Sequence, residues 1–337
     1  MHPLAQRVLD GELRAAARVM RLIDDRAEGH VTILKDLFPH SGRAALIGVT
    51  GTPGAGKSTL CDRLIEHYRK EDKKVGVVCV DPTSPFTGGA ILGDRIRMQR
   101  HFLDDNVFIR SVATRGALGG LSRSATDVAR VLDAYGCDVV LIETVGVGQD
   151  ELDVTRTAHT TLVVVPPGGG DDVQANKAGI LEIADVFVVN KADREGADAQ
   201  VRHLESMIAL GREIKAGQIK APASHAFHGA VPEPIVAADD GSWTPPVLKT
   251  ISARGQGIVE LCAAIEQHRL WLDTEQGRAR RKQQHHAQLL AQFRDTLIEE
   301  ALSTLGDRIE AAVHSVADRK IDPYTVSEEL IAAFRAR

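Results

Sequence analysis

A run of small residues that ends in a lysine and a serine is the part of the sequence best suited to chemistry. Residues 51–58 read Gly-Thr-Pro-Gly-Ala-Gly-Lys-Ser, a complete match to G-x-x-x-x-G-K-[ST]. At this spacing backbone N–H groups can close around phosphate oxygens, the lysine reaches the β- and γ-phosphates, and the serine hydroxyl holds Mg²⁺. An apolar run over 44–49 precedes the motif and a helical pattern follows it. We therefore interpret it as a phosphate-binding loop at the start of a helix.

The whole loop and the first helical residues after it are expected to contact the phosphates. Lys57 is also a candidate catalytic residue, because catalysis of phosphoryl transfer is mainly positioning and charge stabilisation. The expected phosphate-binding residues are Gly51, Thr52, Pro53, Gly54, Ala55, Gly56, Lys57, Ser58 and Thr59.

A second motif follows a later apolar strand, residues 185–190, and is suited to recognising the base of a nucleotide. Residues 190–193 read Asn-Lys-Ala-Asp, a match to Asn-Lys-x-Asp. The Asp193 carboxylate can accept hydrogen bonds from N1–H and the 2-amino group of guanine, a donor pair that adenine lacks. The last strand, 247–251, is followed by three residues placed where a backbone N–H would contact guanine O6. The expected guanine-binding residues are Asn190, Lys191, Asp193, Ser252, Ala253 and Arg254.

Two acids end predicted strands at what would be the same edge of a sheet. Asp81 follows the apolar run 74–80, and Glu143 ends the run 138–143 in the Walker-B arrangement. Ligands of open α/β sheets bind at the carboxyl ends of the strands. A carboxylate there can hold Mg²⁺ directly or through water. Asp81 and Glu143, together with Ser58, are therefore candidate metal-binding residues, and the two acids are candidate catalytic residues.

Three further features bear on hydrolysis. Residues 144–148 form a glycine-containing loop next to the expected γ-phosphate position, which suits a segment that changes shape when that phosphate leaves. Gln149 or one of the carboxylates could orient the attacking water, and the sequence does not choose between them. Lys177 lies beyond a loop over 166–172 and is either a catalytic or switch residue or an exposed helix lysine. No arginine finger is evident, so hydrolysis should be slow without a partner.

Apolar strands alternate with helical segments through the middle of the chain, which predicts a mostly parallel α/β sheet covered on both faces. Residues 3–27 are helical by pattern, with a break near residues 10–11. A Pro-rich stretch over 213–246 interrupts the alternation. It contains His225 and His228, for which an incidental position and a metal-binding role are both open.

The C-terminal region is helical by pattern, with a long helix expected to start at residues 278–282. Its apolar residues recur every three or four positions and exceed what is needed to cover the sheet. We expect these helices to form a dimerisation arm, with packing inside one chain as the alternative. The apolar residues of the stripe are Leu289, Leu290, Phe293, Leu297, Ala301 and Leu305.

Composition limits the possible partners and location. The 337-residue chain carries a net charge of −5, which gives no basic field to recruit nucleic acid or anionic membrane. No apolar run approaches the ~20 residues of a membrane span, and acids near the N-terminus argue against a transit peptide. The four cysteines are far apart in sequence, without a Cys-x-x-Cys pair. They indicate buried packing residues in a reducing cytoplasm.

Several stretches together resemble one family closely, the MeaB/ArgK/MMAA GTPases, which are chaperones of B12-dependent acyl-CoA mutases. The longest of them, Val80 to Met98, is far more specific than the phosphate loop. The resemblance covers roughly residues 1–212 and 243–337. The stretches that carry it are 80–98, Thr114 to Gly120, Glu143 to Gln149 and Asp322 to Tyr324.

The resemblance implies that the protein binds GTP and Mg²⁺ and hydrolyses GTP to gate cofactor loading or protection of a mutase such as methylmalonyl-CoA mutase. It implies a role for Asp94, with Asp81 and Glu143, in holding the metal and its waters. The resemblance does not identify the partner mutase, and it leaves open whether an adenosyltransferase also binds. The implied layout is an N-terminal helical extension (1–42), a P-loop GTPase domain (43–272) and a C-terminal dimerisation arm (273–337). The stretch 213–242 departs from the family as an insertion.

Two other functions share parts of this pattern. One is a kinase linked to amino-acid transport, which would need an acceptor site and a base to take the acceptor's proton. The other is a metal-insertion GTPase of the hydrogenase or urease maturation type, for which His225 with His228, or His285 with His286, would be the candidate ligands.

Overall fold

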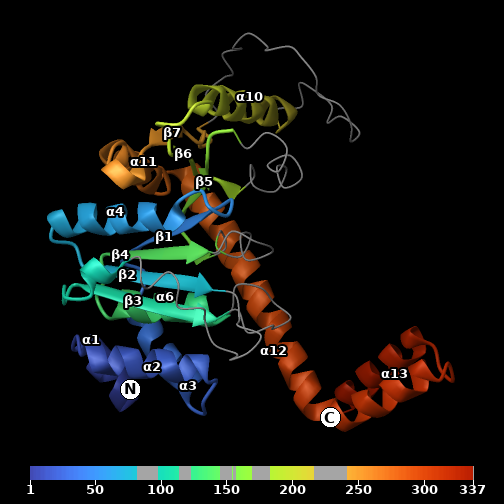
Figure 1. Ribbon diagram of the computed structural model, residues 1–337. Coiled ribbons are helices and arrows are strands. Elements are labelled where there is room, and N and C mark those ends of the chain that lie inside the picture. Colours follow the sequence, from blue (N-terminus) through green and yellow to red (C-terminus); the bar gives the residue numbers. More distant parts are fainter. Residues whose placement is uncertain are drawn as a thin grey trace. The chain divides into compact units, whose positions relative to one another are not determined.

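The computed structural model describes most of the chain (Figure 1). The described residues are 1–81, 98–113, 123–144, 154, 157–168, 183–215 and 241–336. Asp94, Gln149 and Lys177 lie outside them. The chain divides into two compact units, residues 1–283 and 284–337.

The first unit contains a seven-stranded sheet with the order β3-β2-β4-β1-β5-β6-β7 (Figure 1). Every strand pair described is parallel, which confirms the predicted α/β sheet. The strands are β1 (Ala45–Gly51), β2 (Val75–Asp81), β3 (Val107–Ala113), β4 (Val139–Thr144), β5 (Thr160–Val165), β6 (Val186–Asn190) and β7 (Val247–Thr250).

Continuous apolar runs in the strands bury both faces of the sheet. In β5, Leu162 and Val164 pack into a core with helices α4 and α11, whereas Val163 and Val165 pack into a second core with α10. This alternation follows from the two-residue period of a strand. The helices that follow strands are α4 (Lys57–Lys70), α6 (Arg123–Ala134), α10 (Ala197–Lys215) and α11 (Ile258–Trp271).

The N-terminal helices α1 (Pro3–Leu9), α2 (Leu13–Asp24) and α3 (His30–Leu37) pack on α6 and share its apolar core. The predicted break near residue 11 is confirmed, and Gly11 there has φ +79°. Asp133 of α6 accepts hydrogen bonds from the backbone N–H groups of Arg43 (3.1 Å) and Ala44 (2.9 Å). This carboxylate fixes the entry of the chain into β1.

Residues after the segment 82–97 form a short 3₁₀ turn, Gln99–His101. The start predicted for the long C-terminal helix was wrong. The long helix α12 spans Glu275–Ala317 and begins before residue 278. Its first turn contains Gly277, which reads as a helix breaker, but the Thr274 hydroxyl accepts the Gly277 N–H (3.2 Å) and caps the helix.

A buried polar cluster joins the amino ends of β5 and β6 to α11 and the first turns of α12. Asp185 accepts the Thr161 N–H (2.8 Å) and pairs with Arg280 of α12 (2.5 Å). His268 of α11 is fully buried, with Nδ1 2.8 Å from the Thr160 hydroxyl and Nε2 3.4 Å from Asp185. Burial raises the pKa of Asp185 to about 6, against the opposing effect of Arg280. Burial, and then the charge of Arg280, lowers the pKa of His268 to about 3.

The second unit contains the rest of α12 and helix α13 (Pro323–Arg335). Asp322 caps α13 by accepting the N–H groups of Tyr324 and Thr325, both at 3.0 Å. No helix among the described residues is long and apolar enough to cross a membrane. Large apolar side chains of this unit are exposed, among them Leu289, Leu290, Phe293, Leu302, Val313, Tyr324 and Ile331.

Candidate functional site

The carboxyl ends of β1, β4, β6 and β7 bring the predicted motifs to one edge of the sheet. The phosphate loop leaves β1, the Walker-B acid lies in β4, and the guanine motif begins at the last residue of β6. Because parallel strands all end at the same edge, this convergence follows from the topology. The candidate site therefore lies at this edge of the sheet.

Two glycines of the phosphate loop occupy positions that no other residue could take. Gly51 has φ +127°, and a Cβ there would lie 2.0 Å from the carbonyl oxygen of Val164. Gly56 has φ +94°, and its Cβ would lie 2.5 Å from Nδ2 of Asn190. Any side chain would therefore push the loop away from β5 and from the guanine motif. The loop's close approach to both neighbours depends on glycine.

Lys57 and Ser58 begin α4 directly after this loop, and both are buried. The Lys57 amine donates hydrogen bonds to the carbonyl oxygens of Gly51 (2.8 Å) and Thr52 (3.2 Å). These contacts bend the long side chain back over the loop, with its positive charge inside the curve of the backbone. Such an arrangement presents a cation and helix-start N–H groups to an anion. In the loop Ala55 is buried, whereas Pro53 and Gly54 are exposed, as is Thr59 in the first turn of α4.

The Ser58 hydroxyl donates a 2.6 Å hydrogen bond to Glu143 Oε1. The two side chains are only 5% and 3% exposed, so two hard oxygen ligands lie together at the base of the loop. Next to them, the Thr144 hydroxyl donates to the Thr50 hydroxyl (3.0 Å) and ties β4 to β1. Asp81 ends β2 one residue beyond the Val80–Thr144 pair, on the same edge. Oxygen donors in this arrangement are what Mg²⁺ prefers.

Asn190 lies at the centre of the site, only 2% exposed. Its Nδ2 donates to the carbonyl oxygen of Ala55 (2.8 Å) in the phosphate loop. Its Oδ1 accepts the Thr250 hydroxyl (3.1 Å), the Ser252 N–H (3.1 Å) and the Ser252 hydroxyl (2.8 Å). One side chain thus fixes the phosphate loop and the loop after β7 relative to each other. Lys191 adds a second tie, because its amine donates to Gly54 O (2.6 Å).

Asp193 and the 3₁₀ turn Ser252–Arg254 frame the remaining part of the site. The Asp193 side chain is 39% exposed and lies 3.9 Å from the Arg254 guanidinium. Of the turn's three backbone N–H groups, that of Ser252 is held by Asn190, and that of Arg254 donates to Ile251 O (2.9 Å). The Ala253 N–H makes no hydrogen bond within the described part of the chain, so it remains available to a ligand.

Arg63 of α4 contacts this turn and was not predicted from the sequence. Its Nε donates to Ser252 O (3.0 Å) and its Nη2 to Ala253 O (3.1 Å). Glu66, one turn further along α4, holds Nη1 (2.7 Å). No local pattern marks Arg63, because its partners are 189 and 190 residues away in sequence.

Asp62 on the same helix anchors residues that follow the segment 82–97, again without a sequence signal. Arg100 binds Asp62 through Nε (2.7 Å) and Nη2 (2.5 Å), and Nε2 of His101 lies 2.9 Å from the same carboxylate. Burial raises the pKa of Asp62, but the hydrogen bonds from His101 and Arg100 outweigh it, and the net pKa is lowered. Asp62 therefore stays ionised and keeps both partners on α4.

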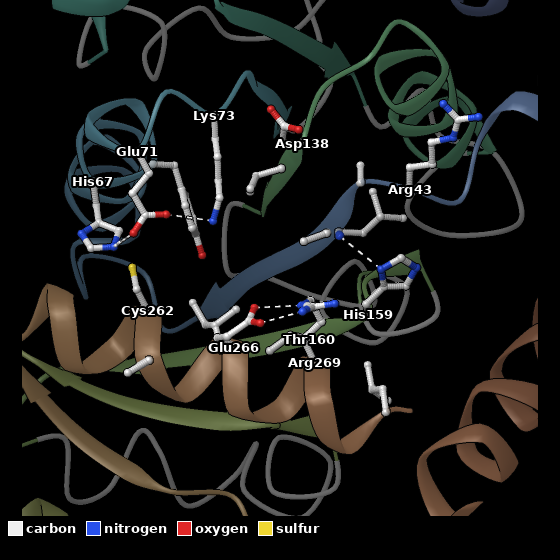
Figure 2. Close-up of a pocket in the computed structure, with 18 of the residues that line it drawn as sticks. Arg43, His67, Glu71, Lys73, Asp138, His159, Thr160, Cys262, Glu266 and Arg269 are labelled. Carbon is white, nitrogen blue, oxygen red and sulfur yellow. Dashed lines mark hydrogen bonds and ion pairs between the residues drawn. The ribbon is translucent and has the colours of Figure 1, made fainter. Parts of the chain in front are cut away.

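A cavity of about 610 Å³ opens at the opposite edge of the sheet, between the amino ends of β1, β4 and β5 and the helices α4 and α11 (Figure 2). Its charged side chains largely neutralise one another. Glu71 contacts His67 (3.3 Å) and Lys73 (2.8 Å), and Glu266 contacts Arg269 (2.6 Å). None of the predicted nucleotide-binding residues lines the described walls of this cavity. The cavity and the convergent motifs are therefore separate features.

A parallel sheet with a G-x-x-x-x-G-K-[ST] loop and an Asn-Lys-x-Asp motif at one edge defines the class of P-loop GTPases. The family described as methylmalonyl-CoA mutase-associated GTPase MeaB matches residues 16–305. The chain therefore belongs to this family, and it is a guanine-nucleotide-binding GTPase.

Individual proteins agree with this assignment. A protein of Pyrococcus horikoshii named as a GTPase is 44% identical over 337 residues, covering 96% of this chain and 95% of its own length. GTPase ArgK of Escherichia coli is 36% identical over 264 residues, covering 77% of this chain and 73% of its own. The crystal structure of a LAO/AO transport system kinase has 25% identity and a TM-score of 0.65, covering 98% of this chain and 96% of that one.

Proposed function

We propose that GTP binds along the carboxyl edge of the sheet, from the phosphate loop to the turn after β7. The observation that carries this proposal is the Asn190 side chain, which bonds Ala55 of the phosphate loop and Ser252 of the turn at once. In this arrangement the loop N–H groups and Lys57 bind the phosphates. Asp193 accepts N1–H and the 2-amino group of guanine, and the Ala253 N–H donates to O6.

The oxygen atoms of Ser58 and Glu143 fit a magnesium ion, since both are buried hard ligands only 2.6 Å apart. Asp81 ends its strand on the same edge, and the proposed role of Asp94 falls in a segment outside the described residues. When bound, Mg²⁺ would neutralise charge on the β- and γ-phosphate oxygens. The Ser58–Glu143 hydrogen bond keeps the two side chains side by side.

Hydrolysis joins the oxygen of a water molecule to the γ-phosphorus, breaks the bond to the β,γ-bridging oxygen and releases GDP and phosphate. The contribution of the described residues is positioning and charge stabilisation. Lys57 is held over the loop by Gly51 and Thr52, so its charge meets the oxygens on which negative charge develops. The residue that orients the water remains among the predicted candidates, Gln149 and the carboxylates, with Lys177 as a further catalytic candidate.

We further propose that the GTPase cycle serves an adenosylcobalamin-dependent acyl-CoA mutase, by gating the loading or protection of its cofactor. The support is the description of the family, which names methylmalonyl-CoA mutase as the associated enzyme. Four buried cysteines fit our expectation that the protein acts in a reducing cytoplasm. The test is GTP hydrolysis by the full chain, alone and with such a mutase from the same source.

A large rise in GTP hydrolysis with the mutase, absent with ATP, is the expected result of that test. No rise with any mutase, together with transfer of labelled γ-phosphate to another protein or solute, would favour the alternative of a transport-linked kinase. That alternative has one specific observation behind it, the name of the solved structure that the chain resembles.

We also propose that residues 273–337 act as a dimerisation arm. Leu289, Leu290 and Phe293 of α12 are 66%, 54% and 60% exposed, which is unusual for large apolar side chains at helical spacing. Sedimentation of the full chain should show a dimer at micromolar concentration, and Phe293→Glu should shift it towards monomer. A strict monomer for the unmodified chain would contradict the arm.

A further inference from the structure

In the proposed site, the N–H of the Ser252–Ala253 peptide group recognises guanine O6. Arg63 binds the carbonyl oxygen of the same peptide group. Arg63 Nε donates to Ser252 O (3.0 Å), the carbonyl oxygen of that peptide group. The described residues contain no cis peptide bond. In a trans peptide group the C=O and N–H bonds point in opposite directions. Fixing the oxygen against α4 therefore aims the Ala253 N–H away from α4.

The neighbouring peptide groups are fixed as well. Arg63 Nη2 donates to Ala253 O (3.1 Å), and the Arg254 N–H of that same peptide group donates to Ile251 O (2.9 Å). The Ser252 N–H on the other side is held by Asn190 (3.1 Å). The Ala253 N–H thus belongs to a turn whose other backbone N–H groups already donate hydrogen bonds within the chain. A cationic donor on the carbonyl also polarises the peptide group and strengthens its N–H as a donor.

We propose that Arg63 is a positioning residue for guanine recognition, acting through the Ser252–Ala253 peptide group. This inference rests on the proposed nucleotide site. It also gives α4 two roles in that site, because the helix begins with Lys57 and Ser58 at the phosphate end and reaches the base end through Arg63. Lysine would not replace it fully, since two carbonyl oxygens are bound by two nitrogen atoms of one planar guanidinium.

Glu66 orients the Arg63 guanidinium. Its carboxylate accepts from Arg63 Nη1 (2.7 Å) and also from Arg100 Nη2 (3.1 Å) and Lys70 Nζ (3.1 Å). The hydrogen bond from Arg63, followed by that from Lys70, lowers the pKa of Glu66 to about 2. Glu66 is therefore ionised throughout the neutral range and holds Nη1, which leaves Nε and Nη2 for the turn.

The experiment compares the affinity of Arg63→Ala and the unmodified chain for three nucleotides. GDP and IDP both carry O6, whereas 2-aminopurine riboside diphosphate lacks it. We expect about ten-fold weaker binding of GDP and IDP, the effect of one neutral hydrogen bond, and a change of less than about two-fold for the 2-aminopurine nucleotide. Equal weakening for all three, or no weakening for any, would overturn the proposal.

Two further variants complete the design. Arg63→Lys keeps the charge and the aliphatic stem, and it should show the same nucleotide pattern if Arg63→Ala does not fold. Arg269→Ala is the matched control, because Arg269, like Arg63, pairs with a glutamate three residues away on its own helix, but it does not contact the turn. It should bind all three nucleotides like the unmodified chain. If the unmodified chain does not prefer GDP to ADP, the proposed base site fails, a result distinct from failure of the Arg63 proposal.

Discussion

The buried imidazole of His268 should make the protein sensitive to acid. Its pKa is about 3 in the folded chain, against an ordinary value of 6.5. Folding therefore favours the neutral ring, and its contribution to stability is present above pH 6.5 and is lost as the pH falls below it. At pH 5, about 1.5 pH units below the ordinary pKa, the ring is protonated in the unfolded chain and neutral in the folded chain. This difference lowers the free energy of unfolding by about 2 kcal/mol relative to pH 8.

Asp185 acts in the opposite direction over the same interval. Its pKa is raised from 3.8 to about 6, so its protonation in the folded chain adds stability as the pH falls from 6 towards 3.8. At pH 5 this gain is about 1.4 kcal/mol. The two effects partly cancel in the unmodified chain, and His268→Gln should separate them. The change in unfolding free energy from pH 8 to pH 5 should be about 2 kcal/mol more positive for His268→Gln than for the unmodified chain.

The two tryptophans of the chain make this measurement direct. Their rings lie beside His268, with centroids 4.8 Å (Trp243) and 5.5 Å (Trp271) from the imidazole. Urea unfolding followed by tryptophan fluorescence at pH 8 and pH 5 gives the four free energies that are needed. The exposed His286, changed to glutamine, is the control. Parallel pH dependence of His268→Gln and the unmodified chain would refute the assignment of a neutral, buried His268.

Three predictions concern the nucleotide site. Asp193→Asn should weaken GDP about 10²-fold and favour XDP, whose 2-oxo group accepts from the amide; equilibrium binding of both nucleotides checks this. Ser58→Ala should abolish the rise in GTP affinity that Mg²⁺ produces in the unmodified chain, as measured by titration with and without the metal. Asn190→Ala should lower the nucleotide-free unfolding free energy by about 2–4 kcal/mol, because four hydrogen bonds end on this buried side chain. A loss under about 1 kcal/mol would argue against its central role.

The parts of the site that the sequence predicts are those whose chemistry requires a fixed local spacing. Gly51 and Gly56 can be predicted because a phosphate loop needs positive φ and close backbone approach at set positions. The apolar strands could be predicted for a similar reason, since a sheet buried on both faces leaves continuous apolar runs. Parallel pairing then brings residues from β1, β4 and β6 to one edge.

The contacts that the sequence did not reveal join residues far apart in the chain. Arg63 reads as an ordinary surface arginine of an amphipathic helix until β7 places Ser252 beside it. Asp185 and His268 likewise read as a strand-end acid and a helix histidine, although both are buried and Asp185 contacts both His268 and Arg280. Such pairs depend on which strand lies next to which, and local periodicity carries no information about that.

The measurement that tests the account most directly is equilibrium binding of GDP and ADP to the full chain in the presence of Mg²⁺, by calorimetry. If Asp193 and the Ala253 N–H read the base as proposed, GDP should bind at least about 100-fold more tightly than ADP. Equal affinities for the two nucleotides, or binding of neither, would contradict the assignment of the carboxyl edge of the sheet as a guanine-nucleotide site.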